Sequence, residues 1–483
     1  FMKEVIKLKN NDTEFETLHS NKHRIYLFIG IVCVVVLLVA IVLNFTQAKY
    51  KLTESIPLIN GTINYTPYDF KVMAMYQEDD TGEYVEIESM PSSGYAINEE
   101  LSYCTLDNVN KDNDAILYTN NNGEHVISNL KKNSKCYLYF DIYEGPTAGE
   151  SIITNLTISA TRSGAITGPL TSNTTGTIYS VEDDFGTSYV YAGDVDNNWV
   201  YFAGFYWRII RINGDGSIRM IYSGTSTTTT GTSTQITVNG SNTFRYNPTY
   251  GDNTYVGYMT GLQNECASTA SCSGSSRTTS YSQSTNNTYD SNIKTVLDEW
   301  YEDNIRGTEY EQYISTEQGF CNDRSLNTTS ETWSNSDTKL GYGTNATAYG
   351  PYGRLFLNDL WRSSQTPTLK CSQTNDYFTV DESSRGNHAL DYPVGLITID
   401  EIILAGGFGG SNNISFWLNT NQVYWTMSPY NFNGSASVFY IDQNGYLYSW
   451  GVTDMYGVRP IINLDANITL TGSGTTSSPY EIS

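Results

Sequence analysis

The chain has 483 residues, a formal net charge of −24 and 39% hydrophobic residues. At roughly 150 residues per domain, this length allows about three domains. Such an acidic chain does not suit nucleic-acid binding, because a phosphate backbone requires a basic face. The 40 Gly, 39 Tyr and 12 Pro exclude a helical bundle or a coiled coil, and four His leave little scope for metal or acid–base chemistry. The composition is typical of an acidic, Tyr-rich, β-rich protein of the cell exterior.

An uncharged stretch over residues 25–45 predicts a transmembrane helix. At 1.5 Å per residue it would span about 31 Å, close to the hydrocarbon thickness of a bilayer. Five Lys or Arg precede the stretch, whereas Lys49 and Lys51 follow it. This bias predicts a single-pass membrane protein with a cytoplasmic tail, residues 1–24, and an extracellular bulk. The alternative is a signal peptide cleaved near residues 46–48, which would also export the bulk of the chain.

The cysteines fit an exported protein. Cys33 lies within the apolar stretch, and the other six follow it. Six cysteines allow 15 pairings. No Cys-x-x-Cys spacing occurs, which weighs against zinc ribbons and thioredoxin chemistry and favours a disulfide framework. The order along the chain suggests the pairs Cys104–Cys136, Cys266–Cys272 and Cys321–Cys371.

Composition divides the exported part into three segments. Residues 50–144 alternate β-branched and aromatic runs with turns, which predicts a small β-sandwich-like domain acting as a stalk. Residues 145–177 are rich in Gly, Ser, Thr and Pro and are expected to form a linker. Residues 178–483 show no repeat, so a solenoid or propeller is not indicated. We expect this last segment to be one domain with long loops.

Two helices are predicted in the last segment. Apolar residues recur at i, i+3, i+4, i+7 and i+8 from Ile293 to Tyr301, so one helix should begin near Ser291. A capping-box pattern begins at Thr398, and Gly406 supplies a stop. The second helix is therefore expected to run over about 399–405.

Two hairpins are also predicted, each with a three-residue loop. In the first, a loop over 214–216 pairs Ile212 with Ile218 and Ile210 with Met220.

The second hairpin surrounds Gly445, which is expected to take the left-handed position of a bulged turn. This register pairs Ile441 with Leu447 and Tyr440 with Tyr448. It is preferred over a two-residue turn because it separates one apolar face from one polar-aromatic face. The displayed residues would be Tyr440, Asp442, Tyr446 and Tyr448.

The sequence around the second hairpin predicts a ligand-binding patch. Large rings with few rotatable bonds are mixed there with small polar groups, as in antibody-like paratopes. Cross-strand stacking in a Tyr-rich protein would explain the same rings. The candidate ligand-binding residues are Tyr430, Asn431, Phe432, Asn433, Ser435, Ser437, Tyr440, Asp442, Tyr446, Tyr448, Ser449, Trp450, Thr453 and Asp454.

Motifs in the last 60 residues resemble a known family. They are the run Tyr-Trp-Thr-Met-Ser-Pro over 424–429, the Gly-Val-Arg-Pro run over 457–460 and the Gly/Ser/Thr-rich end over 472–480. Together they resemble bacterial surface proteins with a C-type lectin-like domain. They are similar in particular to the variable proteins of diversity-generating retroelements, a group that includes the phage major tropism determinant. The Gly-Val-Arg-Pro run looks like the strand motif that closes such domains, related to the Gly-Phe-Arg signature of formylglycine-generating enzymes.

The resemblance covers about residues 178–483 and implies a fold class. The chain is expected to be β-rich α+β, with an N-terminal transmembrane helix, a small β-sandwich-like domain and then a C-type lectin-like (formylglycine-generating-enzyme-like) domain.

The resemblance also implies a fixed scaffold that presents a hypervariable patch. In that family the diversified codons derive from template adenines, commonly in Asn codons. Asn, Tyr, Asp, Ser, Thr and Phe can all be reached from such a codon. Only these residue types stand at positions 431–433, 435, 437, 440, 442, 446, 448, 449, 453 and 454. Trp450 and Met455 cannot be reached from AAC, so their codons differ or lie outside the diversified set.

Three alternatives compete with a binding protein. An enzyme of the formylglycine-generating type would need reactive cysteines, whereas the six here are expected to be paired, and His388 lies in a loop. A calcium-dependent sugar lectin would need more than the Asp-Val-Asp-Asn-Asn run over 194–198, which lacks the following Gly and a bidentate Glu. A structural coat protein would bury its Tyr-rich face against neighbours. We expect no catalysis, no metal and no cofactor, and a protein or glycan ligand on another cell, phage or host surface.

Overall fold

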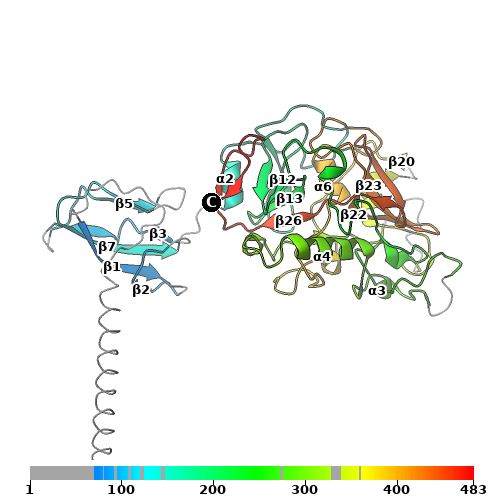
Figure 1. The fold of residues 1–483 in the computed structure, drawn as a ribbon, viewed down its shortest axis with the longest axis horizontal. Coiled ribbons are helices and arrows are strands. Elements are labelled where there is room, and N and C mark those ends of the chain that lie inside the picture. Colours follow the sequence, from blue (N-terminus) through cyan, green and yellow to red (C-terminus); the bar gives the residue numbers. More distant parts are fainter. Residues whose placement is uncertain are drawn as a thin grey trace, which may run out of the picture. The chain divides into compact units, whose positions relative to one another are not determined.

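The computed structural model describes residues 70–79, 81–91, 95–106, 110–119, 125–142, 147–271, 276–327, 339–357 and 360–483. The predicted cytoplasmic tail (1–24) and transmembrane helix (25–45) lie outside the described residues. Among the helices in the described part of the chain, none combines the length and the apolar character that a membrane span needs. The chain divides into two compact units, Phe1–Gly145 and Pro146–Ser483 (Figure 1).

The first unit is built on a five-stranded sheet in the order β2-β1-β7-β3, with β4 also pairing with β7. β1 and β7 run parallel, while β2, β3 and β4 are antiparallel to their neighbours. β5 and β6 form a separate hairpin. The strands are β1 (Phe70–Glu78), β2 (Tyr84–Ile87), β3 (Tyr95–Ile97), β4 (Tyr103–Thr105), β5 (Ile116–Thr119), β6 (His125–Ser128) and β7 (Ser134–Ile142).

The core of the first unit follows from alternation along its strands. In β7, Cys136, Leu138 and Phe140 are buried and the residues between them are half-buried. The Cys104–Cys136 disulfide fixes β4 to β7, which confirms this predicted pair.

The second unit contains a seven-stranded sheet in the order β26-β13-β12-β10-β9-β8, with β11 pairing with β12. Its last strand, β26, comes from near the C-terminus and closes the sheet against β13. The strands are β8 (Thr157–Ser159), β9 (Thr177–Glu182), β10 (Thr187–Val190), β11 (Trp199–Phe202), β12 (Phe205–Ile212), β13 (Ile218–Tyr222) and β26 (Ile461–Leu464).

A four-stranded sheet of the second unit has the order β18-β22-β23-β24. Its strands are β18 (Thr347–Ala348), β22 (Tyr424–Phe432), β23 (Ala436–Ile441) and β24 (Leu447–Gly451). Short two-stranded pairs complete the strands described: β14 (Phe244–Arg245) with β25 (Met455–Tyr456), β15 (Met259–Thr260) with β16 (Tyr289–Asp290), β17 (Phe320–Cys321) with β21 (Tyr377–Phe378), β19 (Phe356–Leu357) with β20 (Leu360–Trp361), and β27 (Leu470–Thr471) with β28 (Glu481–Ile482).

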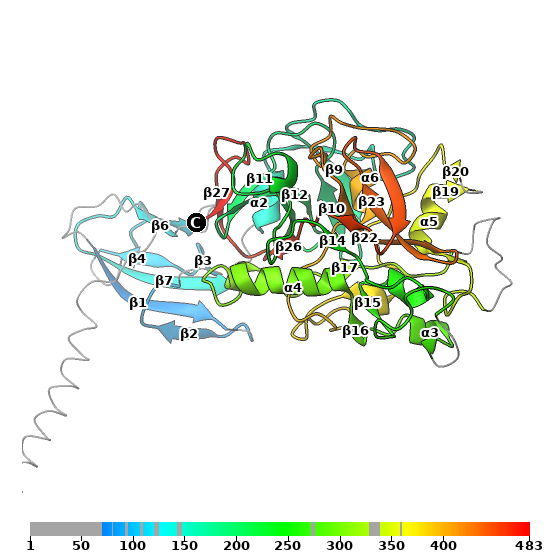
Figure 2. The same ribbon diagram turned by 45° about the vertical axis from the view of Figure 1, so that its right-hand side comes forward.

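Short helices cover these sheets, and α4 is the long helix visible along one side of the second unit (Figure 2). Ser291 caps α4 and the Thr398 capping box begins α6, so both predicted helices are confirmed. The α-helices are α2 (Ala148–Ile153), α3 (Tyr281–Ser284), α4 (Asn292–Asn304), α5 (Gly350–Leu355) and α6 (Ile399–Leu404). The 3₁₀ turns are η1 (Gly231–Thr234), η2 (Asn253–Val256), η4 (Glu311–Tyr313) and η5 (Thr374–Asp376).

The predicted linker over 145–177 is wrong for residues 147–177. These residues form α2 and β8, and β8 pairs in parallel with β9 at the edge of the seven-stranded sheet. Ala148, Ile152 and Ile166 lie in the core of the second unit. Composition misled the prediction, because the apolar residues in this Gly/Ser/Thr-rich segment are few, yet several of them are buried.

The first predicted hairpin is correct only near its turn. Ile212 pairs with Ile218, but Met220 pairs with Ile209 because a bulge at Ile210 shifts the register. Bulges depend on the strands packed on either side, and a short sequence pattern does not report those neighbours.

Candidate functional site

The second predicted hairpin forms the centre of the candidate site, and its register is confirmed. Ile441 pairs with Leu447, and Tyr440 pairs with Tyr448. Gly445 has a φ of +70°, the left-handed conformation that the predicted bulged turn requires. An added Cβ there would lie 2.0 Å from the carbonyl oxygen of Asn413, so glycine is required for space as well.

The carboxylate of Asp442 holds this turn. Its Oδ1 accepts hydrogen bonds from the backbone N–H groups of Asn444 and Tyr446, both at 2.8 Å. The backbone N–H of Asp442 also donates to the carbonyl of Tyr446 at 2.9 Å. Asp442 was predicted to contact a ligand, and its first role in the structure is to fix the turn.

Five rings in contact with one another, together with Trp450 on the same face, form a group across this hairpin that we call the aromatic strip. Tyr446 lies 5.5 Å from Tyr448, and Tyr448 lies 5.8 Å from Tyr440, measured between ring centroids. Alternation along β24 places Trp450 on the same face as Tyr448. The members of the strip are Trp361, Tyr440, Tyr446, Tyr448, Trp450 and Tyr456.

The two ends of the strip differ in accessibility. Tyr448 and Trp450 on β24 are 46% and 51% exposed. Tyr440 is half-buried between Tyr456, at 4.6 Å, and the buried Trp425, at 6.3 Å. Burial, with Tyr456 nearby, raises the pKa of Tyr440, which therefore remains a neutral phenol. The strip thus has a fixed inner row and an exposed outer row.

Polar side chains gather around Gly451, which pairs with Ser437 and by alternation lies on the opposite face of β24 from Trp450. A Cβ at Gly451 would lie within 4 Å of Asp454 Oδ2, Ser435 Oγ and Thr453 Oγ1. Glycine therefore leaves a shallow space that these three oxygens surround, and we call them the polar corner. Burial raises the pKa of Asp454, with Arg245 opposing the shift.

Several predicted site residues lie elsewhere. Phe432 is fully buried in the core, so its prediction as a ligand contact is wrong. Tyr430 packs on Tyr352 and Phe439 instead of joining the strip. Ser437 and Ser449 alternate with the strip residues along β23 and β24 and are half-buried on the opposite face. Asn431 is half-buried in β22, and Asn433 is exposed at the turn after it.

Sequence reasoning missed three residues at the site. Trp361 arrives from β20 and donates its indole N–H to the Tyr446 hydroxyl at 3.1 Å. Tyr456 and the 52%-exposed Met455 belong to β25. Proximity in sequence could have suggested Tyr456 and Met455, but no local signal connects position 361 to the hairpin.

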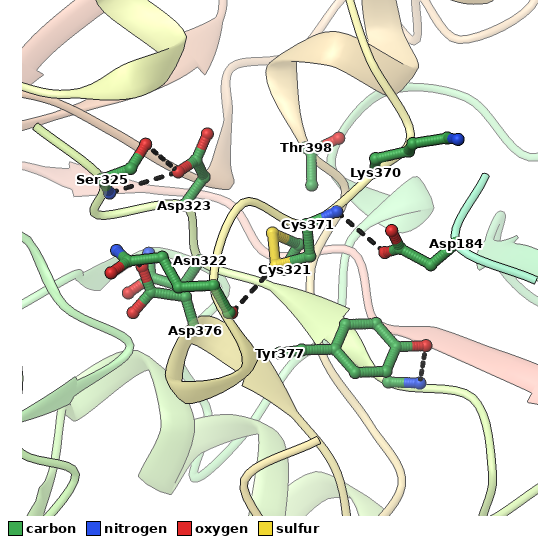
Figure 3. Close-up of a disulfide and its surroundings, with 12 residues drawn as sticks. Asp184, Cys321, Asn322, Asp323, Ser325, Lys370, Cys371, Asp376, Tyr377 and Thr398 are labelled. Carbon is green, nitrogen blue, oxygen red and sulfur yellow. Dashed lines mark hydrogen bonds between the residues drawn. A yellow bond between two sulfur atoms is a disulfide. The ribbon is translucent and has the colours of Figure 1, made fainter. Parts of the chain in front are cut away.

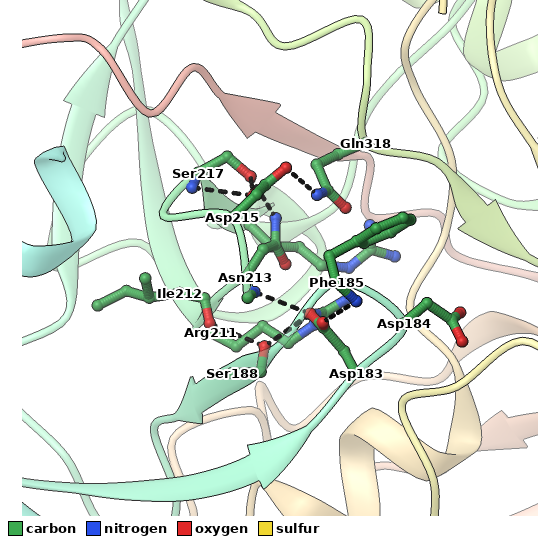
Figure 4. A network of polar contacts seen from close by, with 12 residues as sticks. Asp183, Asp184, Phe185, Ser188, Arg211, Ile212, Asn213, Asp215, Ser217 and Gln318 are labelled. Carbon is green, nitrogen blue, oxygen red and sulfur yellow. Dashed lines mark hydrogen bonds and ion pairs between the residues drawn. The ribbon is translucent and has the colours of Figure 1, made fainter. Parts of the chain in front are cut away.

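Beneath this surface the second unit has a buried charge network. Glu401 Oε1 forms ion pairs with Arg219 Nε at 2.6 Å and Arg211 Nε at 3.2 Å. Arg211 also bonds to Asp183 and Ser188, each at 2.9 Å (Figure 4). Burial alone would raise the pKa of Glu401, but the two arginines together hold it below its usual range. Because Glu401 also completes the capping box of α6, one carboxylate fixes both the helix and the sheet.

A cavity of ≈ 30 Å³ adjoins this network and the Cys321–Cys371 disulfide. It has room for one or two waters but not for an organic ligand. The disulfide itself confirms another predicted pair, and the Cys371 N–H donates to Asp184 at 2.8 Å (Figure 3). Cys272 lies outside the described residues, so the predicted Cys266–Cys272 pair stays a prediction.

Two acidic groups bear on cation binding, one found in the structure and one, the 194–198 run, considered in the sequence. Asp290, Asp298 and Asp391 place carboxylate oxygens within 4.8 Å of one another, but Lys294 Nζ lies among them at 2.5–3.2 Å. In the 194–198 run, Asn198 Oδ1 accepts from Arg208, and its amide nitrogen donates to a carbonyl. The side chain of Asn198 therefore stabilises the fold and is not available as an oxygen ligand.

The loop histidine that was considered under the enzyme alternative, His388, lies at the surface. His388 is exposed, with a φ of +56°, and its Nδ1 lies 3.3 Å from the carbonyl oxygen of Val380. No family model, curated protein or solved structure matches the chain.

Proposed function

We propose that the chain is a cell-surface ligand-binding protein that presents the aromatic strip and the polar corner on a C-type lectin-like scaffold. Residues 25–45 would anchor it in the membrane with the N-terminus in the cytoplasm, and the first unit would act as a stalk. The disulfides Cys104–Cys136 and Cys321–Cys371 support an extracytoplasmic location, because such bonds persist in oxidising compartments. The ligand would be a protein or glycan on another cell, phage or host surface, bound without catalysis.

The observation that carries this proposal is the exposure of large rings along one strand. Buried hydrophobic residues elsewhere in the second unit form one core, yet Tyr448 and Trp450 are about half exposed. Contiguous exposed rings next to small polar groups are typical of recognition surfaces, since a ring buries much area and loses little rotamer entropy on contact. The packed inner row beneath them would keep the outer rings in place.

The structure is also compatible with a diversified patch. Between 438 and 447, the apolar residues Val438, Phe439, Ile441 and Leu447 are all fully buried. Most of the positions proposed to vary are exposed or half-buried, with Phe432 as the exception. A scaffold with this division could change its surface residues while its core stays constant. We therefore propose that the chain is a variable protein of a diversity-generating retroelement.

A binding comparison between matched variants tests this function. The full chain, reconstituted in lipid nanodiscs, is applied to arrays of glycans and purified cell-surface proteins. We expect Tyr446→Ser/Tyr448→Ser to lose the signals of the wild type. Tyr201→Ser/Tyr289→Ser removes two exposed tyrosines from other strands and should retain these signals. Signals that survive the first variant, or that both variants lose equally, would contradict the proposed site.

A further inference from the structure

The first unit carries a second tyrosine-rich surface, on the open face of its five-stranded sheet. Alternation along β7 sends Leu138 into the core and Tyr137 and Tyr139 to the opposite face. Tyr76 pairs with Tyr139 across β1 and β7, so it lies on the same face. We call this surface the tyrosine face; its members are Tyr76, Tyr84, Tyr103, Tyr137 and Tyr139.

These five rings form one layer. Tyr76 stacks on Tyr139 at 4.8 Å, and Tyr103 stacks on Tyr137 at 5.0 Å. Tyr84 meets Tyr139 edge-on at 5.3 Å. All five rings are half-buried. In the described part of this unit, they make their ring contacts with one another. The outer surface of the layer is therefore accessible and chemically suited to a protein interface, where tyrosine is enriched.

The charges on this face are separated along the strand direction. Lys71 and Lys135 lie opposite each other at the start of β1 and β7, and Lys111 lies 4.9 Å from the Tyr103 ring. Acidic residues occupy the other end, where the Tyr84 hydroxyl donates to Asp141. Strand register places these acids on the tyrosine face; they are Glu78, Glu86 and Asp141.

We infer that the tyrosine face pairs with the same face of a second copy of this chain, with the strands antiparallel. A two-fold axis running across the strands brings the basic end of each copy over the acidic end of the other. The tyrosine layers then meet between the two charged ends. This arrangement gives an interface with a ring-rich centre and complementary charges at the rim, and the charges fix the relative orientation.

The pairing matters for what the chain can bind. Two copies joined through their first units would present two recognition patches. Simultaneous engagement of a repeated ligand converts the second contact into an intramolecular one and raises the overall affinity without new contacts. The inference itself does not depend on the proposed function, since it uses only contacts within the first unit.

Reversing charged side chains at the two ends of the tyrosine face tests whether two copies of the chain pair through it. The full chain in detergent is studied by sedimentation velocity and light scattering over a range of concentrations. We expect a dimer whose dissociation constant rises at least tenfold in Lys71→Glu and again in Glu86→Lys. The combined Lys71→Glu/Glu86→Lys chain should recover much of that loss, because each copy again offers opposite charges at its two ends. Both side chains are exposed, so folding should be retained and is checked by circular dichroism.

Matched controls and a ring variant complete the test. Lys370→Glu and Glu481→Lys reverse exposed charges in the second unit and should leave the dimer unchanged. Tyr137→Ser/Tyr139→Ser should give a monomer. A wild-type chain that is monomeric throughout would overturn the inference, as would a dimer that survives every variant. A monomer whose melting temperature falls in Tyr137→Ser/Tyr139→Ser would show that another part of the same chain covers this face, which also overturns it.

Discussion

The second unit holds a cluster of charged side chains in its interior, whereas some of the large rings at its hairpin lie at the surface. Arg219 is 2% exposed and Glu401 likewise, whereas Trp450 is 51% exposed. A buried charge must be paired, because leaving it without its partner costs several kcal/mol. An exposed ring has no such constraint and can be replaced cheaply. The comparison teaches that the scaffold and the recognition surface use different interactions, so changes in one should leave the other intact.

The largest effect is expected from removing the carboxylate that holds the charged interior together. Glu401→Gln would leave Arg211 and Arg219 buried at short range without their shared partner. We expect the free energy of unfolding of the second unit to fall by about 3–5 kcal/mol, measured by urea denaturation. Glu382→Gln makes the same chemical change at an exposed loop position and should be neutral within about 0.5 kcal/mol. Equal stability of both variants would contradict a scaffold fixed by buried ion pairs.

An effect of intermediate size, dependent on pH, is expected on the free energy of unfolding at Asp298, the ion-pair partner of Lys294. Burial raises the pKa of Asp298 to about 6, although Lys294 opposes the shift. The folded state therefore holds this proton more tightly than an unfolded Asp, whose pKa is about 3.9. The resulting stabilisation is complete below pH 4 and is lost as the pH rises through 6. Relative to Asp298→Asn, the wild type should lose about 1–3 kcal/mol between pH 4 and pH 7.

The control for this pH effect lies on the same helix. Asp303 is exposed on α4, so Asp303→Asn should leave the pH profile of unfolding parallel to that of the wild type. A profile for Asp298→Asn that is also parallel to the wild type would contradict a raised pKa at Asp298.

Structural features that depend on residues close together in the sequence were predicted, whereas contacts between distant segments of the chain were not. The second hairpin was predicted in register because its turn and its alternation are local. The capping box of α6 was predicted for the same reason, but the ion pairs of its Glu401 with Arg211 and Arg219 were not. Those contacts join segments about 190 residues apart, and nothing in either segment reports the other.

The same limit explains the errors at the candidate site. Phe432 alternates with surface residues in the sequence, yet it pairs with Thr347 of β18 and is covered by the core. Trp361 joins the strip through a tertiary contact with Tyr446. Tyr440, Tyr446 and Tyr448 were predicted correctly to share one face, because cross-strand pairing follows from the hairpin register.

A smaller effect on stability is expected at the outer row of the strip. Tyr446→Ala/Tyr448→Ala should lower the free energy of unfolding by no more than about 1–2 kcal/mol while it abolishes ligand binding. Thermal unfolding and array binding of the same preparation measure both quantities. If this variant unfolds, the two rings belong to the scaffold and the division between interior and surface fails.

The smallest effect is expected at the most exposed ring. Trp450→Ala should change the free energy of unfolding by less than about 0.5 kcal/mol, because the ring is half exposed at the edge of the sheet. Val438 pairs with Trp450 across β23 and β24 and is fully buried, so Val438→Ala should cost more, about 1–3 kcal/mol. Denaturant unfolding of the two variants measures both free energies. The difference between them would show that, within one cross-strand pair, Val438 belongs to the scaffold and Trp450 to the surface.

The central claim is that the hairpin face of the four-stranded sheet is a variable recognition surface. Deep sequencing of codons 424–464 across a natural population of this gene tests it most directly. The account predicts substitutions at template adenines in the codons for the accessible positions 435, 440, 446, 448, 453 and 454. The codons for Val438, Phe439, Ile441 and Leu447 should stay constant. A uniform sequence, or substitutions spread equally over buried and exposed codons, would contradict the claim.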